Sequence, residues 1–203
     1  AMISYDTGEN VAESLERLQD ISPDARNRAR MMYLKALLHI RADDYPSALE
    51  TAQALRDEYP ENKDHWAFLA ELANVTKNYK RAENITREAL EQWPEDISLM
   101  YSLSMSLSSQ KKNNQAIRLL EDVLLLDESN NMATNALAYT LAEEKRDLPR
   151  ALSLARKALS RDPENASILD TLAWVYYRMG SYDDAWKNIK LCVAKGVEDP
   201  VIW

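Results

Sequence analysis

One apolar pattern recurs along the chain every 34 or 35 residues, and this repetition restricts the fold more than any other feature. The clearest copy covers residues 166–199, and Gly180-Ser181 divides it into two stretches. Apolar residues in each stretch are three or four apart, a spacing that places them on one face of a helix. They are Leu169, Leu172, Ala173 and Tyr176 in the first stretch, and Ala185, Ile189 and Cys192 in the second. We therefore expect a helical hairpin with one apolar face.

The same pattern is present in five copies, which cover residues 29–62, 63–96, 97–130, 131–165 and 166–199. An alanine stands at the same place in the second stretch of every copy, as Ala48, Ala82, Ala116, Ala151 and Ala185. A hairpin of this size cannot bury its apolar face alone, whereas a stack of hairpins can. The repetition thus predicts a row of helix pairs whose core runs along the row.

An asparagine or aspartate ends every copy and indicates where the next helix begins. These residues are Asn62, Asp96, Asn130, Asn165 and Asp199. Their side-chain oxygens can accept a hydrogen bond from a free backbone N–H group in the first turn of a helix, which is typically worth about 1 kcal/mol. We predict that each of them caps the helix that follows.

The repeated residues resemble the pattern of the tetratricopeptide repeat family, a 34-residue helix–turn–helix unit. In the second copy the pattern is carried by Trp66, Leu69, Ala70, Ala82, Ala89 and Pro94. The resemblance implies an all-α fold, in which antiparallel helix pairs form a right-handed superhelical solenoid of five full repeats with partial units at both ends. The departures from the pattern are Lys35, His39, Glu128 and one extra residue in the turn at 145–149.

Both ends of the chain fall outside the five copies. Residues 1–28 combine a start without pattern, which we expect to be disordered, with a short helix typical of half a repeat. Residues 200–203 match the start of a truncated sixth unit. We expect an excised piece of a longer array, and a natural C-terminus with a frayed end is the alternative. The apolar face of the last hairpin, around Ile189, Val193 and Trp203, then predicts end-to-end self-association.

Charge and composition argue against several classes of partner. The net charge is −8, and the chain lacks the clustered lysines and arginines that phosphate binding requires. Nucleic acid is therefore not expected as a partner, and direct membrane insertion is not expected because no stretch reaches the length of a spanning helix. Cys192 is the single cysteine and is expected in the core. The compartment stays open between the cytoplasm and the periplasm or envelope.

The sequence predicts no catalytic, cofactor or metal site. The two histidines, His39 and His65, lie in different copies. The segment 127–131 has the acidic character of a calcium loop but lacks its glycine and its final glutamate, so an inter-repeat turn is favoured. We therefore expect that the chain is not an enzyme.

A groove is the remaining candidate site, because the resemblance implies that the first helix of each pair lines a concave surface. The predicted partner-binding residues are Tyr101, Met105, Asn135, Tyr139, Asp170, Trp174, Tyr177 and Arg178. Trp174 and Tyr177 are expected to be exposed there because Leu172, Ala173 and Tyr176 already take the packing positions. Mixed aromatic and amide side chains are typical of surfaces that bind peptides.

These features favour a non-catalytic scaffold that binds a partner peptide or helix in its groove, as part of a larger bacterial protein. The Lys, Asn and Arg clamp with which some family members hold a C-terminal carboxylate is missing, so an extended or helical segment is the expected ligand. The alternative is a regulatory or substrate-presenting arm of a larger enzyme.

Overall fold

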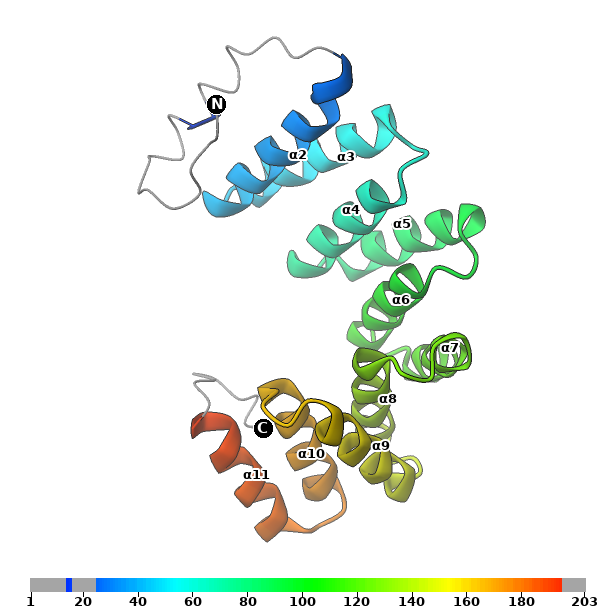
Figure 1. Cartoon of the computed structure of the whole chain (residues 1–203), viewed down its shortest axis with the longest axis vertical. Helices are drawn as coiled ribbons and strands as arrows, with labels where there is room; N and C mark the ends of the chain where they lie inside the picture. The colour runs from blue at the N-terminus through cyan, green and yellow to red at the C-terminus, as the bar shows by residue number, and fades with distance from the viewer. Residues whose placement is uncertain (1–13, 16–24, 195–203) are drawn as a thin grey trace. The chain divides into compact units, whose positions relative to one another are not determined.

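The computed structural model describes residues 14–15 and 25–194, and every helix bounded within them is an α-helix. The chain forms two compact units, which we call unit 1 (up to Trp93) and unit 2 (from Pro94). Each unit is built of antiparallel helix pairs joined by short turns (Figure 1). The predicted all-α fold of paired helices is therefore confirmed.

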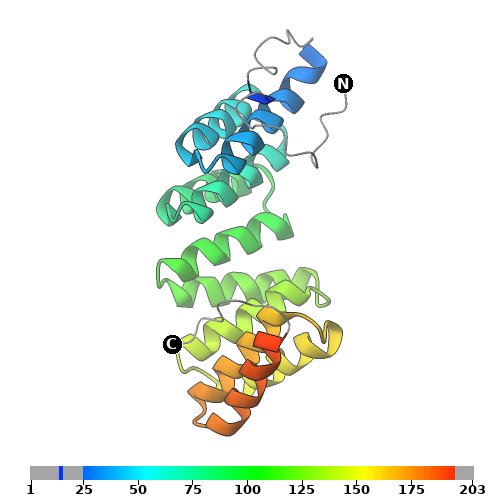
Figure 2. The ribbon, with the colours of Figure 1, turned by 90° about the vertical axis from the view of Figure 1, so that its left-hand side faces the viewer.

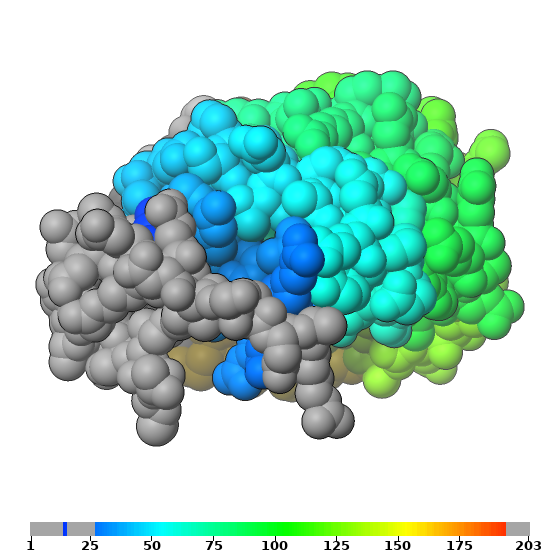
Figure 3. Space-filling view, turned by 90° about the horizontal axis from the view of Figure 1, so that it is seen from above, coloured from blue at the N-terminus to red at the C-terminus, as the bar shows by residue number. Residues whose placement is uncertain are grey.

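From residue 25 onward, where its helices are described, unit 1 contains two helix pairs. Its helices are α2 (Ala25–Arg41), α3 (Tyr45–Glu58), α4 (Lys63–Val75) and α5 (Tyr79–Gln92). Each helix packs against the next one along the chain, and Figure 3 shows the atoms of α2 to α4 in close contact. The indole of Trp66 helps to join the pairs, because its Nε1 donates to the Pro60 carbonyl at 2.8 Å and its ring lies 4.4 Å from the Arg56 guanidinium.

The described part of unit 2, which ends at residue 194, contains three helix pairs. Its helices are α6 (Ile97–Ser109), α7 (Asn113–Leu126), α8 (Asn131–Glu143), α9 (Leu148–Arg161), α10 (Ala166–Arg178) and α11 (Tyr182–Ala194). Besides the contacts between successive helices, α8 also packs against both α6 and α10 (Figure 2). The first helices of the three pairs therefore form one row, which positions the candidate site.

The core is made where a small side chain of one helix meets its neighbour. The recurring alanine near the start of each second helix is at most 3% exposed in every pair. The first helices have a small buried residue of their own, such as Ala70 in α4 and Ala138 in α8. In α6 the equivalent residue is Ser104, which is also fully buried and whose hydroxyl donates to the Tyr101 carbonyl at 2.6 Å. Small residues at these places let two helix backbones approach closely, so that leucines such as Leu137 and Leu141 fill the remaining space.

Side-chain caps begin four of the helices as the sequence predicts. Asn62, Asp96, Asn130 and Asn165 accept backbone N–H groups in the first turns of α4, α6, α8 and α10. The fifth predicted cap, Asp199, lies outside the described residues, as do residues 200–203 and most of the predicted half-repeat helix.

The turn inside each pair contains a residue in the left-handed conformation at an equivalent position. These residues are Asp43, Lys77, Lys111, Lys145 and Gly180, with φ from 50° to 81°. The α8–α9 turn is one residue longer than the other turns within pairs of unit 2, and Asp147 is left-handed there as well. The predicted extra residue is therefore absorbed within the turn, and α8 and α9 still pack against each other as a pair.

Candidate functional site

A groove of about 560 Å³ opens on the row of first helices in unit 2. Five of the eight predicted partner-binding residues line it, namely Tyr101, Met105, Asn135, Tyr139 and Asp170. They occupy two sets of equivalent positions, because Tyr101, Asn135 and Asp170 are 34 or 35 residues apart, as are Met105 and Tyr139. Stacked pairs bring equivalent positions side by side, which is how residues far apart in sequence come to share one wall.

The wall is apolar at one set of positions and polar at the other. Met105 and Tyr139 are 41% and 39% exposed, large values for side chains of this type. Asn135 and Asp170 are partly buried beside them. A surface of this kind combines apolar area with a few oriented polar groups, which is the usual composition of a binding site.

The structure corrects the prediction that Trp174 is exposed in the groove. Its side chain is only 9% exposed, and it is not among the residues that line the groove. The ring stacks on Tyr177, with centroids 5.4 Å apart and an interplanar angle of 17°, and the Arg178 guanidinium lies 5.2 Å from its centre. The prediction was wrong because it counted the packing positions along one face and ignored the cover that neighbouring side chains of the same helix provide.

Tyr177 and Arg178 also lie away from the lining of the groove. Tyr177 is 39% exposed, and its second ring contact is with Tyr182 of α11, at 5.5 Å between centroids. Arg178 donates from Nη2 to the carbonyl of Glu143 in α8. These two residues therefore connect α10 to the helices on either side of it.

Residues that the sequence analysis did not select complete the groove. They include Lys111, Asn113, Ala136, Thr140, Ala166, Ser167, Thr171 and Cys192. Asn113 and Cys192 come from second helices, which the family pattern does not assign to a groove. Only the packing of α7 and α11 against the row brings them to it, so the repeat pattern alone carries no signal for them.

The electrostatics of the groove centre on Asp170. Burial raises the pKa of its carboxyl group. Burial, followed by the negative charges of Glu143 and Asp170, raises the pKa of the Tyr139 hydroxyl, while the charge of Arg178 opposes this shift. Burial and then the charge of Asp170 raise the pKa of the Cys192 thiol. The Asp170 carboxylate thus influences groups on both α8 and α11.

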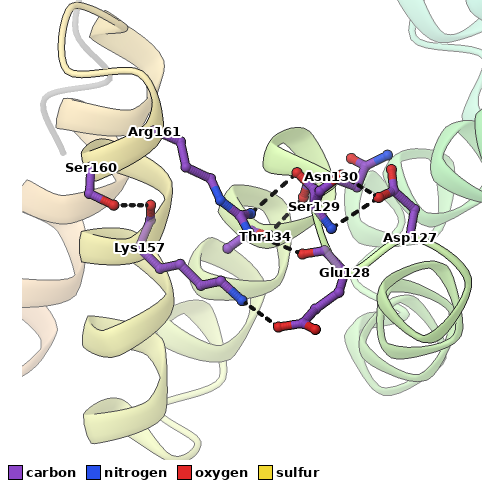
Figure 4. A network of polar contacts seen from close by, with 8 residues as sticks. All are labelled: Asp127, Glu128, Ser129, Asn130, Thr134, Lys157, Ser160 and Arg161. Atoms are coloured by element: carbon purple, nitrogen blue, oxygen red, sulfur yellow. Dashed lines mark hydrogen bonds and ion pairs between the residues drawn. The ribbon is translucent and has the colours of Figure 1, made fainter.

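The segment that has some character of a calcium loop is an inter-repeat turn (Figure 4). Asp127 Oδ1 accepts from the backbone N–H and the hydroxyl of Ser129, at 2.9 and 2.6 Å. Lys157 pairs with the Glu128 carboxylate at 3.1 Å, and Arg161 donates to the carbonyl groups of Glu128 and Ser129. Ser129 thus engages the Asp127 carboxylate within the turn, and α9 engages the Glu128 carboxylate and two carbonyl groups of the turn.

Metal centres and membrane spans are two other kinds of site that the chain could have carried. In the part of the chain that the structure describes, no three His, Cys, Asp or Glu side chains are grouped so that they could hold a metal ion. Nor does any helix described here combine the length and the apolar character needed to cross a membrane.

Comparison with known proteins agrees with the architecture. The family model described as "Tetratricopeptide repeat" matches residues 33–97 and 101–166. A TPR repeat-containing protein of Pseudomonas aeruginosa is 30% identical over 150 residues, which are 74% of this chain and 25% of that protein. This chain therefore spans about a quarter of that relative's length.

Two solved structures show the same fold. A thermophilic TPR protein of Thermus thermophilus has a TM-score of 0.71 at 15% identity, over 84% of this chain and 93% of that one. YrrB, described as a TPR protein with an unusual peptide-binding site, has a TM-score of 0.60 at 18% identity, over 94% of each chain.

Replacing Trp174 with alanine should destabilise the protein by about 3 kcal/mol or more, because it removes a large buried side chain. Thermal and denaturant unfolding measure the loss. Trp186→Ala is the matched control, because Trp186 is 59% exposed on α11 and its removal should cost about 1 kcal/mol or less. Equal losses in the two variants would contradict the burial of Trp174.

Replacing Asp170 with asparagine should stabilise the free protein at neutral pH. A carboxyl group with a raised pKa holds its proton more tightly in the folded protein than in the unfolded chain, so its contribution to stability falls as the pH rises through the folded pKa. The gain in melting temperature should therefore be larger at neutral pH than near 3.8, the ordinary pKa of an aspartate. Asp122→Asn, at an exposed position of α7, should show little change at either pH, and an Asp170→Asn variant less stable than the parent at neutral pH would refute the expectation.

Proposed function

Because the chain belongs to the tetratricopeptide repeat family, we propose that it is a non-catalytic protein-interaction scaffold whose unit 2 groove binds a peptide or helical segment of a partner. The observation that carries the proposal is the groove of about 560 Å³, whose wall leaves Met105 and Tyr139 exposed. Exposed apolar area in a concave surface favours binding, because its removal from water gains about 25 cal/mol per Å². The structural neighbour YrrB, which is described as having a peptide-binding site, supports the same class of ligand.

A protein partner also fits the charge of the chain better than a nucleic acid does. The net charge of −8 repels phosphate groups, and Lys111 is the one cationic residue in the described lining of the groove. Lys111 is moreover 3.5 Å from the Glu143 carboxylate, so part of its charge is already balanced. We therefore place nucleic acid outside the proposed partners.

We further propose that these repeats belong to a larger bacterial protein. The match to the Pseudomonas aeruginosa relative, of which this chain covers 25%, supports the proposal. The alternative function, an arm that regulates an enzyme or presents its substrate, is compatible with the same observation. Sequencing the full gene separates the two, because a catalytic domain on the same chain would favour the arm.

Peptide binding should depend on Met105. Peptides selected from a random displayed library against the full chain should bind Met105→Ala about tenfold more weakly, because a hot-spot residue near the centre of an interface costs about 2 kcal/mol or more when it is truncated. Fluorescence anisotropy with a selected peptide measures the change.

Met132→Ala is the matched control for that titration, because Met132 is 64% exposed on α8 but does not line the groove. The Met132→Ala variant should bind the selected peptide with the same affinity as the parent protein. Selected peptides that bind the parent and Met105→Ala equally would place the binding surface elsewhere.

The outer face of α11 is the proposed surface for the end-to-end self-association that the sequence predicts. The prediction that Ile189 is exposed was wrong, since this side chain is 3% exposed, whereas Val193 is 50% exposed. Tyr182 and Trp186 are also well exposed, and helical spacing places them on the same face as Val193. The proposed contact therefore uses a row of exposed apolar side chains on the last described helix.

Sedimentation should then show a mass that rises with protein concentration, because association removes the apolar row of α11 from water. Trp186→Glu should shift the equilibrium toward the monomer, and Leu125→Glu, at an 84% exposed position of α7, should leave it unchanged. A parent that stays monomeric at all concentrations would end the self-association proposal.

A further inference from the structure

Two residues that line the groove of unit 2 each have a buried acceptor oxygen without a donor in the described part of the chain. The two atoms are Oδ1 of Asn135 and Oδ1 of Asp170. The two residues occupy equivalent positions on α8 and α10, which pack against each other. A buried acceptor that lacks a hydrogen bond is costly, so a ligand that supplies N–H donors at this place gains more than one that does not.

Three donor groups of neighbouring side chains in the groove are engaged elsewhere. The hydroxyl of Thr140 donates to the carbonyl of Ala136 at 2.7 Å, and that of Thr171 donates to the carbonyl of Ser167 at 3.0 Å. Asn113 donates from Nδ2 to Glu144 at 2.6 Å. The two threonine contacts lie within α8 and α10, and the Asn113 contact joins α7 to the residue that follows α8, so none of these donors serves the two oxygens.

The charge of the groove points in the same direction. Its described lining carries two carboxylates, Glu143 and Asp170, against the single ammonium group of Lys111, which lies near Glu143. Arg178 donates to the Glu143 carbonyl and lies over Trp174, and neither of these contacts involves the Asp170 carboxylate. Among the described lining residues, the cationic group thus pairs with Glu143 and leaves Asp170 to a cation from outside.

We propose that the segment bound in this groove carries a lysine or arginine side chain, whose N–H groups donate to Asp170 and Asn135. The inference rests on the proposed function and adds the chemistry of the partner. Next to the cation, an apolar side chain of the same segment contacts Met105 and Tyr139, the exposed part of the wall. Arginine suits the site better than lysine, because its planar group carries five N–H donors and can reach two oxygens together.

The test uses one library of random displayed peptides and two selections, against the full chain and against its Asp170→Asn variant. Peptides selected by the parent should contain lysine or arginine at a fixed distance from an apolar residue. Peptides selected by the variant should keep the apolar residue and lose the basic one. A peptide from the first selection should bind the variant at least about tenfold more weakly, because the loss of a hydrogen bond to a charged group lowers affinity by about tenfold or more.

Three further measurements make the result specific. Asp122→Asn, which removes an exposed carboxylate on α7, should leave the affinity of the same peptide unchanged, so a general effect of net charge is excluded. The peptide with its basic residue replaced by norleucine should bind parent and Asp170→Asn equally. The melting curve of free Asp170→Asn shows whether the variant is folded when its affinity is measured.

The outcomes separate this inference from the proposed function. Peptides that depend on Met105 but carry no basic residue, or that bind parent and Asp170→Asn equally, would overturn the cation site and leave a peptide-binding groove. Peptides that bind the parent and Met105→Ala equally would overturn both the cation site and the peptide-binding groove. Selection of acidic peptides would contradict the proposal directly, because their carboxylates would meet Asp170 without a compensating charge.

Discussion

Close approach between helix backbones is the constraint on which the two units depend, and it is set by small side chains at a fixed place in each pair. Ala82 and Ala89 in α5, and Ala151, Ala155 and Ala158 in α9, are fully buried. A larger side chain at such a place would separate the helices and open a space that the surrounding leucines could not fill. Since the same contact recurs in each pair, the position of every first helix within its unit follows from it, including the row that forms the groove.

Two buried oxygens of groove residues lack the hydrogen bonds that buried polar atoms in a protein core usually make. In unit 2 the buried hydroxyl groups of Ser104 and Thr140 each donate to a backbone carbonyl, whereas one oxygen each of Asn135 and Asp170 has no donor in the described chain. The free protein is less stable for it, because burial disfavours the charged form of Asp170. A residue that lines a cavity and lowers the stability of the free protein commonly has a role in binding. A substitution there can then raise stability and weaken binding at the same time.

Much of this architecture follows from the sequence, because a repeat supplies the same information several times. The spacing of alanines and leucines places the helices, and the Asn and Asp residues locate the starts of α4, α6, α8 and α10. The register also places five residues in the groove. The position of a residue within the repeat does not determine how its side chain lies against others on the same helix. The stacking of Trp174 on Tyr177, which buries the indole, was therefore missed.

Contributions from second helices are a further limit of the repeat pattern. Cys192 reaches the groove from α11, and Asn113 reaches it from the start of α7. Both depend on how tightly a second helix packs against the row of first helices, and that distance depends on all the side chains between them. The sequence predicts the class of each position, buried or exposed, more readily than the cavity that several such positions enclose.

The row of first helices also has a spacing, and this spacing acts as a ruler for any chain that crosses it. Packed helices lie about 8–10 Å apart. A polypeptide in the polyproline II conformation advances about 3.1 Å per residue and completes one turn every three residues, so one turn covers nearly the same distance. A ligand that crosses α6, α8 and α10 in this conformation would present every third side chain to successive helices, and its recognition motif would have a period of three.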